Sequence, residues 1–494
     1  MLNNIKCITT DFALKENINY DSYLVMLCRE CAPALSKMPL SAEAKQMIEM
    51  FLQKHKDIFS AGTINKLSVI ENGSLKYIYL AGCGEGKECN PNNFRKSSGE
   101  AVRKIQADKA ENTLVLAPIL LGENRNHYLK ALAEGLFLGS YKFEEFKSDA
   151  KAGAVCKFSI ASAAVKADEV VEAAEKIAEG VCLARNLINR PGNVVTPYIM
   201  AEEAKKIASE LNLEIEVLDE DMLKAKGMNA ILAVGQGSVH KPYLVALKYR
   251  GAGDAPFTAY VGKGITFDSG GISIKPDDNM GEMKDDMSGA GAVLGAIKAI
   301  ASLKLPCNIL AVIACAENMP GGNAQRPGDI VKAANGKTIE VISTDAEGRM
   351  VLADAVWYAC QQGAAKVIDI ATLTGAVIIA LGKETSAIVS NDDVLAQAIQ
   401  KYGKLTGESF WQLPALPECR EAIKSDVADL LNSAGRPGGC ITGGLFIGEF
   451  IDKGVQWAHL DIGGTSTADK TSGFKVKGGT GFGTMTLINL AGNL

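Results

Sequence analysis

The sequence predicts an α/β protein with two domains. A smaller N-terminal α/β domain is expected to be joined by a long helix to a larger C-terminal domain, whose mostly parallel central sheet is covered by helices. Three observations support this prediction. The length of 494 residues exceeds what one hydrophobic core normally serves. Short apolar runs alternate with helical patterns, which is typical of parallel sheets flanked by helices. One Ala-, Glu- and Lys-rich helical segment separates two such series.

Residues 1–160 are expected to form the N-terminal α/β domain, with a role in assembly or regulation. Leu75–Ala81 and Asn112–Leu116 are apolar runs typical of buried strands, and His127–Phe137 has a helical pattern. No cluster of titratable residues of catalytic type occurs in this part. The 12 cysteines of the chain fit reduced thiols, and the CxxC of Cys28–Cys31 is interpreted as incidental, because neither a second pair nor a thioredoxin-like context is visible.

Residues 161–190 are expected to form the linker helix. Its apolar residues recur at helical spacing: Val170, Val171, Ala174, Ile177 and Val181. The pattern stops at Arg190-Pro191-Gly192-Asn193, a strong helix-terminating sequence. Residues 191–494 then form the second domain, which opens with a helix over 196–211 whose start is marked by Thr-Pro.

The second domain repeats strand and helix patterns. The strand candidates are Ala259–Val261, Asn308–Ala314, Ile339–Ile342 and Lys366–Thr372, and the helix candidates are Met287–Leu303 and Met350–Gln361. In parallel sheets of this kind, ligands lie beyond the carboxyl ends of the strands. Charged residues that follow such strands are therefore expected to meet at one edge of the sheet.

Two sets of charged residues occupy such positions. The first set is Lys263, Asp268, Lys275 and Asp286, and the second set is Asp345, Glu347 and Arg349. Four carboxylates crowded together would repel, and some would have to stay protonated. Two divalent cations about 3.5 Å apart remove this repulsion and can activate water. The two sets therefore predict a carboxylate-rich site for two metal ions, which points to hydrolysis. The four histidines show no HExxH spacing, so a histidine-ligated zinc protease is not indicated.

Each feature also has a plainer interpretation. Thr344-x-x-Glu347 fits a capping box before the helix near Met350, and this explains the second set equally well when it is taken alone. Lys263 and Lys275, taken alone, are typical of solvated side chains. Asp286 could favour the N-terminal dipole of the helix that follows it. Capping does not explain Arg349 beside two acids, and it does not explain the Asp-Ser-Gly-Gly segment that begins at Asp268.

Several classes of function are disfavoured. The net charge is −5 and no basic run occurs, so nucleic acid and acidic membranes are not expected partners. No apolar run approaches the roughly 20 residues that span a bilayer. The first 20 residues do not look like a secretory signal, and a cytoplasmic location is expected. The Gly-rich segments lack the spacing of a P-loop or a dinucleotide-binding turn.

The sequence of Val261–Pro276, which contains Asp268-Ser269-Gly270-Gly271, closely resembles the metal-binding segment of the leucine aminopeptidases, also called cytosol aminopeptidases. The resemblance extends over nearly all of residues 170–494 and is weaker before residue 160, where Gly135–Ser148 matches best. Further matching segments are Met283–Met287 with Gly289-Ala290, Glu317–Pro320, Arg326–Asp329, Asp345–Arg349, Ala371–Ala376, Trp457–Asp461 and Thr480–Gly483. The family usually has Asn where this chain has Ser343, which puts the finer substrate preference in doubt.

The resemblance implies that residues 191–494 are a catalytic metallopeptidase domain. One tightly bound metal ion would be held by Lys263, Asp268, Asp286 and Glu347. A more exchangeable ion would be held by Asp268, by Glu347 and by the side chain and backbone carbonyl of Asp345. A lysine ligand must be a neutral amine, a form that two neighbouring dications favour. The ions implied are Zn²⁺ or Mn²⁺, or Mg²⁺ at the exchangeable position, since oxygen-rich ligands accept all three.

The resemblance also implies the other roles in the site. Water activated by both ions attacks the scissile carbonyl, Lys275 stabilises the oxyanion, and Arg349, with Leu373, holds a bicarbonate ion that acts as general base. The pocket for the N-terminal side chain would involve Met283, Thr372 and Gly375. Substrate would also contact Lys263, Asp268, Lys275, Asp286 and Asp345. An apolar pocket separates side chains that differ by a methylene by only about 1–3 kcal/mol. A broad preference for leucine and other bulky apolar residues is therefore expected.

An aminopeptidase acting on peptides is the leading interpretation. The alternatives are a dipeptidase for Cys-Gly or other dipeptides of thiol turnover, a DNA-binding regulator, and an inactive scaffold. The acidic net charge disfavours the regulator. The scaffold is disfavoured because all the metal and catalytic positions are present. The resemblance further implies a homohexamer built as a dimer of trimers.

Overall fold

The structure is a computed structural model that describes residues 4–12, 19–121, 125–150 and 155–493. The first 20 residues, expected to carry no secretory signal, lie partly outside this range. The chain divides into two units, one formed by Met1–Cys182 with Asp469–Lys477 and the other by Leu183–Ala468 with Gly478–Leu494. The domain limits expected at residues 160 and 190 stay predictions.

The N-terminal unit contains a six-stranded sheet in the order β1-β6-β5-β2-β4-β3. All neighbouring strands are parallel except β3 and β4, which form an antiparallel hairpin. The strands are β1 (Ile5–Thr10), β2 (Ser22–Leu27), β3 (Ile64–Glu71), β4 (Ser74–Gly82), β5 (Asn112–Leu116) and β6 (Cys156–Ala161). The two strands expected from the apolar runs at 75–81 and 112–116 are thus present as β4 and β5.

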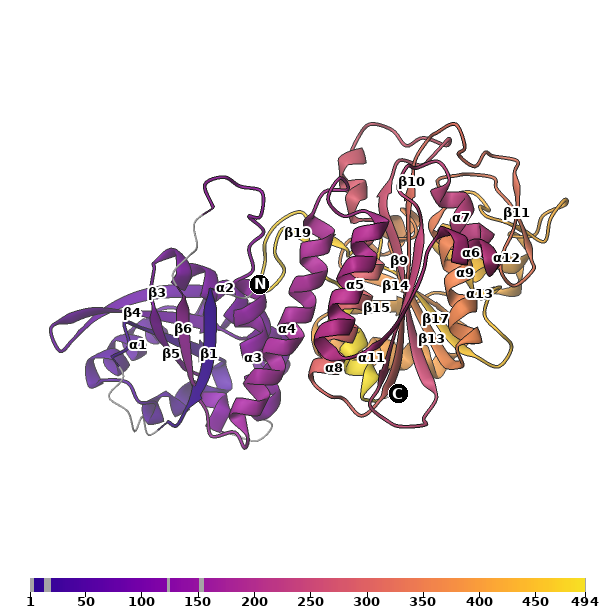
Figure 1. Ribbon diagram of the computed structural model, residues 1–494. Coiled ribbons are helices and arrows are strands. Elements are labelled where there is room, and N and C mark those ends of the chain that lie inside the picture. Colours follow the sequence, from indigo (N-terminus) through magenta and orange to yellow (C-terminus); the bar gives the residue numbers. More distant parts are fainter. Residues whose placement is uncertain (1–3, 13–18, 122–124, 151–154, 494) are drawn as a thin grey trace. The chain divides into compact units, whose positions relative to one another are not determined.

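Helices accompany this sheet (Figure 1), and the expected helix at 127–137 lies within α3. The α-helices are α1 (Ala42–Lys54), α2 (Pro91–Ala107) and α3 (Arg125–Gly139), and the 3₁₀ helices are η1 (Arg29–Lys37), η2 (Lys56–Phe59), η3 (Gly86–Glu88) and η4 (Pro118–Leu121). The side chains of Ser41 and Asn90 cap α1 and α2 by accepting a backbone N–H. The expected linker helix is present as α4 (Ala167–Asn189).

The second unit is built on an eight-stranded sheet in the order β15-β14-β17-β13-β9-β10-β8-β7. Its four central strands, β17, β13, β9 and β10, are parallel. The strands are β7 (Glu214–Leu218), β8 (Tyr243–Arg250), β9 (Phe257–Asp268), β10 (Asn308–Asn318), β13 (Ala364–Ala371), β14 (Thr385–Ser390), β15 (Ser409–Gln412) and β17 (Gln456–Asp461). The carboxyl ends of the four central strands meet at one edge, which is where a ligand site is expected.

Helices cover both faces of this sheet, with α5, α8 and α11 on one side and α7, α9 and α13 on the other (Figure 1). The helices are α5 (Pro197–Leu211), α6 (Glu220–Ala225), α7 (Asn229–Gly235), α8 (Ser288–Ser302), α9 (Gly348–Gln361), α10 (Ala376–Leu381), α11 (Asp393–Thr406), α12 (Pro417–Glu421), α13 (Gly439–Gly448) and α14 (Thr484–Ala491), with the 3₁₀ helix η5 (Met280–Asp285). The three helices expected in this domain are α5, α8 and α9, and Thr196 caps α5 as its sequence indicated.

The start of α8 lies unusually close to the sheet. A Cβ atom added to Gly289 would overlap the backbone carbonyl of Ile370 in β13 and would lie 3.0 Å from the backbone nitrogen of Lys263 in β9. Only glycine permits this approach. The close packing brings Asp286, just before the helix, to the edge of the sheet where β9 and β13 end.

One expected strand has a different place in the fold. The segment expected over 339–342 is β12 (Thr338–Glu340), which pairs with β11 (Ile330–Lys332) and β16 (Leu430–Leu431) in a separate three-stranded sheet. A short hairpin, β18 (Thr467–Ala468) with β19 (Gly478–Gly479), completes the strands. Asp345 and Glu347 therefore reach the site from a loop beyond the small sheet. An apolar run shows that a strand is present, but it does not show which sheet the strand joins.

Within the described segments of the chain, no helix combines the length and apolar character needed to cross a lipid bilayer.

Candidate metal centre

The carboxyl ends of the central strands supply the polar side chains of the site. Asp268 is the last residue of β9 and pairs in register with Asn318, the last residue of β10. Thr372 directly follows β13, and Asp461 ends β17. The sequence predicted a ligand site at this edge, and the structure places Asp268 there.

The helices supply the other carboxylates. Asp286 lies between η5 and α8, and Glu347 occupies the position before the first residue of α9. Carboxylate oxygens of Asp268, Asp286 and Glu347 lie within 4.8 Å of one another, and all three residues are buried. Residues far apart in the sequence thus converge as predicted.

The two lysines lie among these carboxylates. Lys263 Nζ is 2.8 Å from Asp286 Oδ2 and 2.9 Å from Glu347 Oε1, and it donates a hydrogen bond of 2.9 Å to the carbonyl of Thr372. Lys275 Nζ is 2.8 Å from Asp268 Oδ2 and 2.6 Å from Asp345 Oδ1. The structure therefore brings the first charged set together with Asp345 and Glu347 of the second, and neither lysine is a free, solvated side chain.

The electrostatics of the cluster follow from its burial. Burial raises the pKa of Asp286 and Glu347, and neighbouring carboxylates raise both further, while Lys263 opposes the shift. Burial alone would lower the pKa of Lys263, but Asp286, Glu347 and Asp268 outweigh it and raise that pKa. The carboxylates therefore attract positive charge strongly. Lys263 could act as a neutral ligand only if cations of higher charge displaced its proton.

The side chains present fit divalent cations. Oxygen atoms of three buried carboxylates converge, and Glu347 Oε2 is buried without a hydrogen-bond partner among the residues that the structure describes. A buried, unpartnered carboxylate oxygen is costly unless something outside the protein binds it. Oxygen donors suit Mg²⁺ and Mn²⁺, and carboxylate with amine nitrogen also suits Zn²⁺.

Further groups fix the loops that carry the carboxylates. Asn318 Nδ2 donates 2.7 Å to Asp268 Oδ1 and 3.0 Å to the carbonyl of Thr344, and so ties the two charged sets together. Thr344 Oγ1 donates 2.6 Å to the carbonyl of Gly270 and accepts 2.7 Å from the Ser273 backbone N–H. Thr344 is therefore used to join two loops, and no side-chain hydrogen bond caps the start of α9. The capping-box alternative does not describe this site.

Arg349 lies in the first turn of α9 and is buried. Its Nη1 donates 2.8 Å to the carbonyl of Asn432, and its Nε is buried with no hydrogen-bond partner in the described part of the chain. Asn432 also accepts the backbone N–H groups of Ile342 and Ser343 at 2.7 and 3.2 Å. The guanidinium thus keeps a donor available for an anion. Ser343 Oγ accepts the Asp345 N–H at 3.3 Å, so the shorter side chain here serves the local turn.

The expected pocket residues lie on two segments. Thr372 Oγ1 donates 2.7 Å to Asp286 Oδ1, which places the loop after β13 beside the carboxylates. Gly375 is exposed, and a Cβ atom added to it would meet nothing within 4 Å. Met283 is partly exposed in η5, three residues before Asp286. The sequence interpretation gave no role to Asp461, yet its Oδ1 accepts the N–H groups of Leu373 and Thr374 at 3.2 and 3.4 Å.

The sequence did not predict three residues that hold the site in place, which are Asn318, Asp461 and Asn432. Asn318 and Asp461 stand within recognised motifs and end the parallel strands β10 and β17, and this position at the carboxyl edge was the signal that could have identified them. Asn432 follows the two-residue strand β16, and its local sequence contains no comparable signal.

A substitution at Gly348 would test whether the position of the Lys263 amine matters for activity. A Cβ atom at position 348 would overlap the end of the Lys263 side chain, with Nζ only 2.6 Å away. We expect Gly348→Ala to displace this amine and to lower turnover by about 10²-fold, since a misplacement of 1 Å can cost that much. The measurement is kcat on a leucyl amide, the substrate that the family resemblance implies. Gly281→Ala, where an added Cβ meets nothing within 4 Å, is the matched control. Equal activity of the two variants would contradict this account of Lys263.

The model of the cytosol aminopeptidase family catalytic domain matches residues 182–488, and the model of its N-terminal domain matches residues 48–150. The chain belongs to the cytosol aminopeptidase family. A probable cytosol aminopeptidase of Aquifex aeolicus is 42% identical over 91% of this chain and 90% of its own length. A second, from Alkaliphilus metalliredigens, is 43% identical over 84% of this chain and 85% of its own length.

A solved structure is also similar. The bottromycin maturation enzyme BotP in complex with Mn has a TM-score of 0.85 and 32% identity, and the match covers 96% of this chain and 99% of that one. Membership of the cytosol aminopeptidase family makes this protein a metal-dependent aminopeptidase, an exopeptidase that acts on peptides. It also confirms the α/β fold with an N-terminal domain and a larger catalytic domain.

Proposed function

We propose that this aminopeptidase releases leucine and other bulky apolar residues from the N-termini of peptides, with broad specificity. The observation that carries the proposal is the meeting of Lys263, Asp268, Asp286, Asp345 and Glu347 in one cluster at the carboxyl edge of the catalytic sheet. A carboxylate cluster with its own lysines suits both a free α-amino group and a developing oxyanion.

Two divalent cations per subunit would be held by these five residues, with Asp268 and Glu347 shared between them. When bound, they supply Lewis-acid polarisation of the carbonyl and an activated water. We propose Zn²⁺ or Mn²⁺, with Mg²⁺ as an alternative at the exchangeable position. The similar BotP structure supports manganese, because it is a complex with Mn.

Lys275 is proposed to stabilise the oxyanion. Its side chain is 22% exposed, whereas that of Lys263 is 3% exposed, so an arriving carbonyl can reach the Lys275 ammonium more easily. Burial alone would lower the pKa of Lys275, but Asp268 and Glu347 raise it, so the group stays a cationic donor at neutral pH. A preorganised cation in a partly buried site stabilises charge that develops in the transition state.

Arg349 is proposed to hold bicarbonate together with Leu373. The buried Nε without a partner supports this, because it leaves one guanidinium donor for an acceptor outside the protein. A Cβ atom at Gly443 would lie 3.1 Å from both Arg349 Nη2 and a methyl group of Leu373, so the absent side chain leaves space beside the guanidinium. Bound there, bicarbonate would supply the general base that the cluster itself lacks.

The substrate side chain is proposed to contact Met283, Thr372 and Gly375. The exposure of Gly375 and the open space above its Cα support a pocket that admits large groups. Lys263, Asp268, Asp286 and Asp345 would face the α-amino end of the peptide. Relatives are named cytosol aminopeptidases, and we propose a cytoplasmic homohexamer, a dimer of trimers.

Removal and return of metal tests the proposed function. We expect the chelator-stripped protein to lose hydrolysis of a leucyl chromogenic amide and to regain it with Mn²⁺ or Zn²⁺. A glycyl amide should be cleaved more slowly at equal concentration, because a pocket for bulky apolar groups would be left unfilled. If removing and restoring the metal left release of the chromogen unchanged, the metal-dependent mechanism would be contradicted. If the glycyl amide were cleaved faster than the leucyl amide, the proposed preference for bulky apolar residues would be contradicted.

A further inference from the structure

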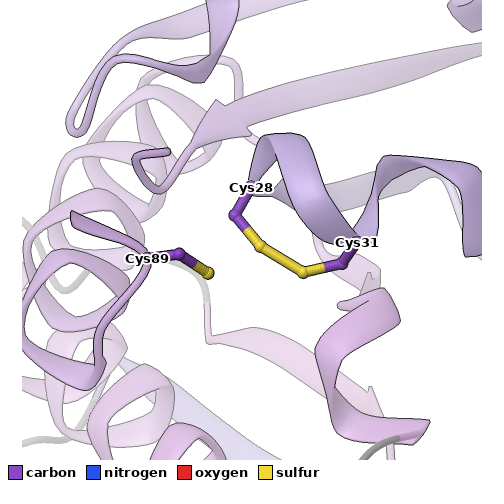
Figure 2. A group of neighbouring side chains, drawn as sticks. All are labelled: Cys28, Cys31 and Cys89. Carbon is purple, nitrogen blue, oxygen red and sulfur yellow. A yellow bond between two sulfur atoms is a disulfide. The ribbon is translucent and has the colours of Figure 1, made fainter. Parts of the chain in front are cut away.

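The N-terminal unit contains a second group of converging metal-ligand side chains. The sulfur atoms of Cys28, Cys31 and Cys89 lie within 4.8 Å of one another. Cys28 and Cys31 form a disulfide with their Cα atoms 5.5 Å apart, and the Cys89 side chain points toward this pair (Figure 2). The sequence interpretation treated Cys28–Cys31 as incidental reduced thiols, because neither a second pair nor a thioredoxin-like context is visible. The structure instead joins the two cysteines in a disulfide and places a third cysteine beside them.

The fold places these cysteines where ligands are expected. Cys28 directly follows β2, and Cys89 lies in the loop after β4, so both stand beyond the carboxyl ends of neighbouring parallel strands. After β2 the chain passes to β3 and β4 on one side, whereas after β5 it passes to β6 on the other, so the strand order reverses between β5 and β2, the strand that Cys28 follows. Such a switch in strand order is the usual ligand position in an open α/β sheet.

Hydrogen bonds hold the two cysteine-bearing loops together. The Arg29 N–H donates 3.3 Å to the carbonyl of Gly84, and the carboxylate of Glu30 accepts the N–H of Gly86. Tyr128 of α3 donates 3.0 Å to the carbonyl of Cys89. The convergence of the three sulfurs is therefore fixed by the backbone on both sides.

The spacing suits a thiolate-bound metal ion. Zinc–sulfur bonds of about 2.3 Å in a tetrahedron place sulfurs about 3.8 Å apart. The observed sulfurs lie within 4.8 Å, and small side-chain rotations after reduction would bring them to that spacing. Cys31 and Cys89 are partly exposed, so a water molecule can reach the fourth position.

A thiol–disulfide exchange catalyst is the competing interpretation. Such catalysts use a thiol whose pKa is lowered by nearby positive charge. Arg29, which lies between the two paired cysteines, is itself paired with Glu85 at 2.7 Å, and Glu30 beside it adds negative charge. This setting is poor for a nucleophilic thiol.

We propose that Cys28, Cys31 and Cys89 bind one Zn²⁺ ion through three thiolates when the Cys28–Cys31 disulfide is reduced. Reduction by two thiols of the glutathione class gives two cysteine thiols and one disulfide of the reductant. Binding then releases three protons, one from each cysteine. This site belongs to the N-terminal unit and is independent of the carboxylate cluster and of the proposed peptidase function.

Cobalt is the probe for this site. The full-length protein is reduced with a phosphine, stripped of metal and titrated with Co²⁺ under anaerobic conditions. We expect a thiolate-to-cobalt charge-transfer band in the near ultraviolet that added Zn²⁺ removes. The carboxylate cluster contains no thiolate among its proposed ligands and gives no such band. The oxidised protein, which retains only one of the three thiols, should show none.

Variants and a mass measurement complete the test. Cys89→Ser should weaken Zn²⁺ binding by about 100-fold or more and remove most of the band, while Cys7→Ser, a partly exposed cysteine of the same unit, should leave both unchanged. In the unmodified reduced protein, Zn²⁺ should protect Cys28, Cys31 and Cys89 from alkylation. This measurement stands even if Cys89→Ser fails to fold. Absence of the band in reduced protein, a full band in Cys89→Ser, or unprotected thiols would overturn the proposal.

Discussion

Glu347→Gln is expected to lower turnover of a leucyl substrate by about 10³-fold or more while the protein stays folded. Glu347 is 1% exposed, is 2.9 Å from Lys263 through Oε1, and has an unpartnered Oε2. The amide keeps the size of the side chain but removes its charge and one acceptor oxygen. Lewis-acid stabilisation supplied by metal ions amounts to several kcal/mol, and each 1.36 kcal/mol is a factor of ten in rate.

The measurement pairs kcat with metal content by atomic emission and folding by circular dichroism. Loss of rate together with loss of bound metal, at an unchanged spectrum, is the expected result. Asp268→Asn should behave in the same way, because Asp268 contributes to the same cluster. Glu282→Gln, an exposed acid in η5, is the matched control and should keep normal rate and metal content. A Glu347→Gln variant with near-normal kcat would remove this residue from the proposed ligand set.

The sequence predicted the part of the site that depends on strand order. Asp268 lies at a strand end, and the parallel alternation of strands and helices was enough to place it at the carboxyl edge, whereas the segment after β13 was expected only from the family resemblance. The helix over Pro197–Leu211 was likewise predictable from its Thr-Pro start. These features are local, or follow from topology, and need no knowledge of distant side chains.

Other features depend on long-range contacts that no local pattern encodes. Thr344-x-x-Glu347 fits a capping box by spacing, but Thr344 bonds to Gly270 and Ser273, which are more than seventy positions earlier in the chain. In the sequence Arg349 stands close to Asp345 and Glu347. In the structure its guanidinium instead donates a hydrogen bond to the carbonyl of Asn432. The position of β12 in a separate sheet is a third case. Competing partners of this kind become visible only when the chain is folded.

The cysteines show the same limit in the N-terminal unit. Cys28 and Cys31 form a recognisable pair, but Cys89 is separated from them by two strands of the sheet and the helix α1. The parallel pairing of β2 with β4 brings its loop beside the pair. A metal site at this pair requires a third ligand. The sequence alone does not show the pairing of β2 with β4 that brings Cys89 to it.

Lys275→Ala is expected to lower kcat by about 10²–10³-fold while both metal ions remain bound. Lys275 contacts Asp268 and Asp345 at 2.8 and 2.6 Å, yet it is not among the proposed metal ligands. Its removal takes away a preorganised donor for the oxyanion, and losing one such donor commonly costs this much in rate. Because the stabilisation is made in the transition state, KM should change little and kcat/KM should fall with kcat.

Measuring kcat and metal content together distinguishes the role of Lys275 from that of the carboxylates, because only the carboxylate variants are expected to lose bound metal. Lys332→Ala, which removes an exposed lysine on β11, controls for loss of a positive charge in the same unit. If Lys275→Ala emptied one metal position, the lysine would act mainly by neutralising Asp268 and Asp345, and the rate loss would follow metal occupancy. If the variant kept full kcat, its proposed oxyanion role would be wrong. Retained metal with reduced kcat is the outcome that the partly exposed, ion-paired geometry of Lys275 predicts, because a cation that can turn toward the substrate is useful only while the carbonyl gains charge.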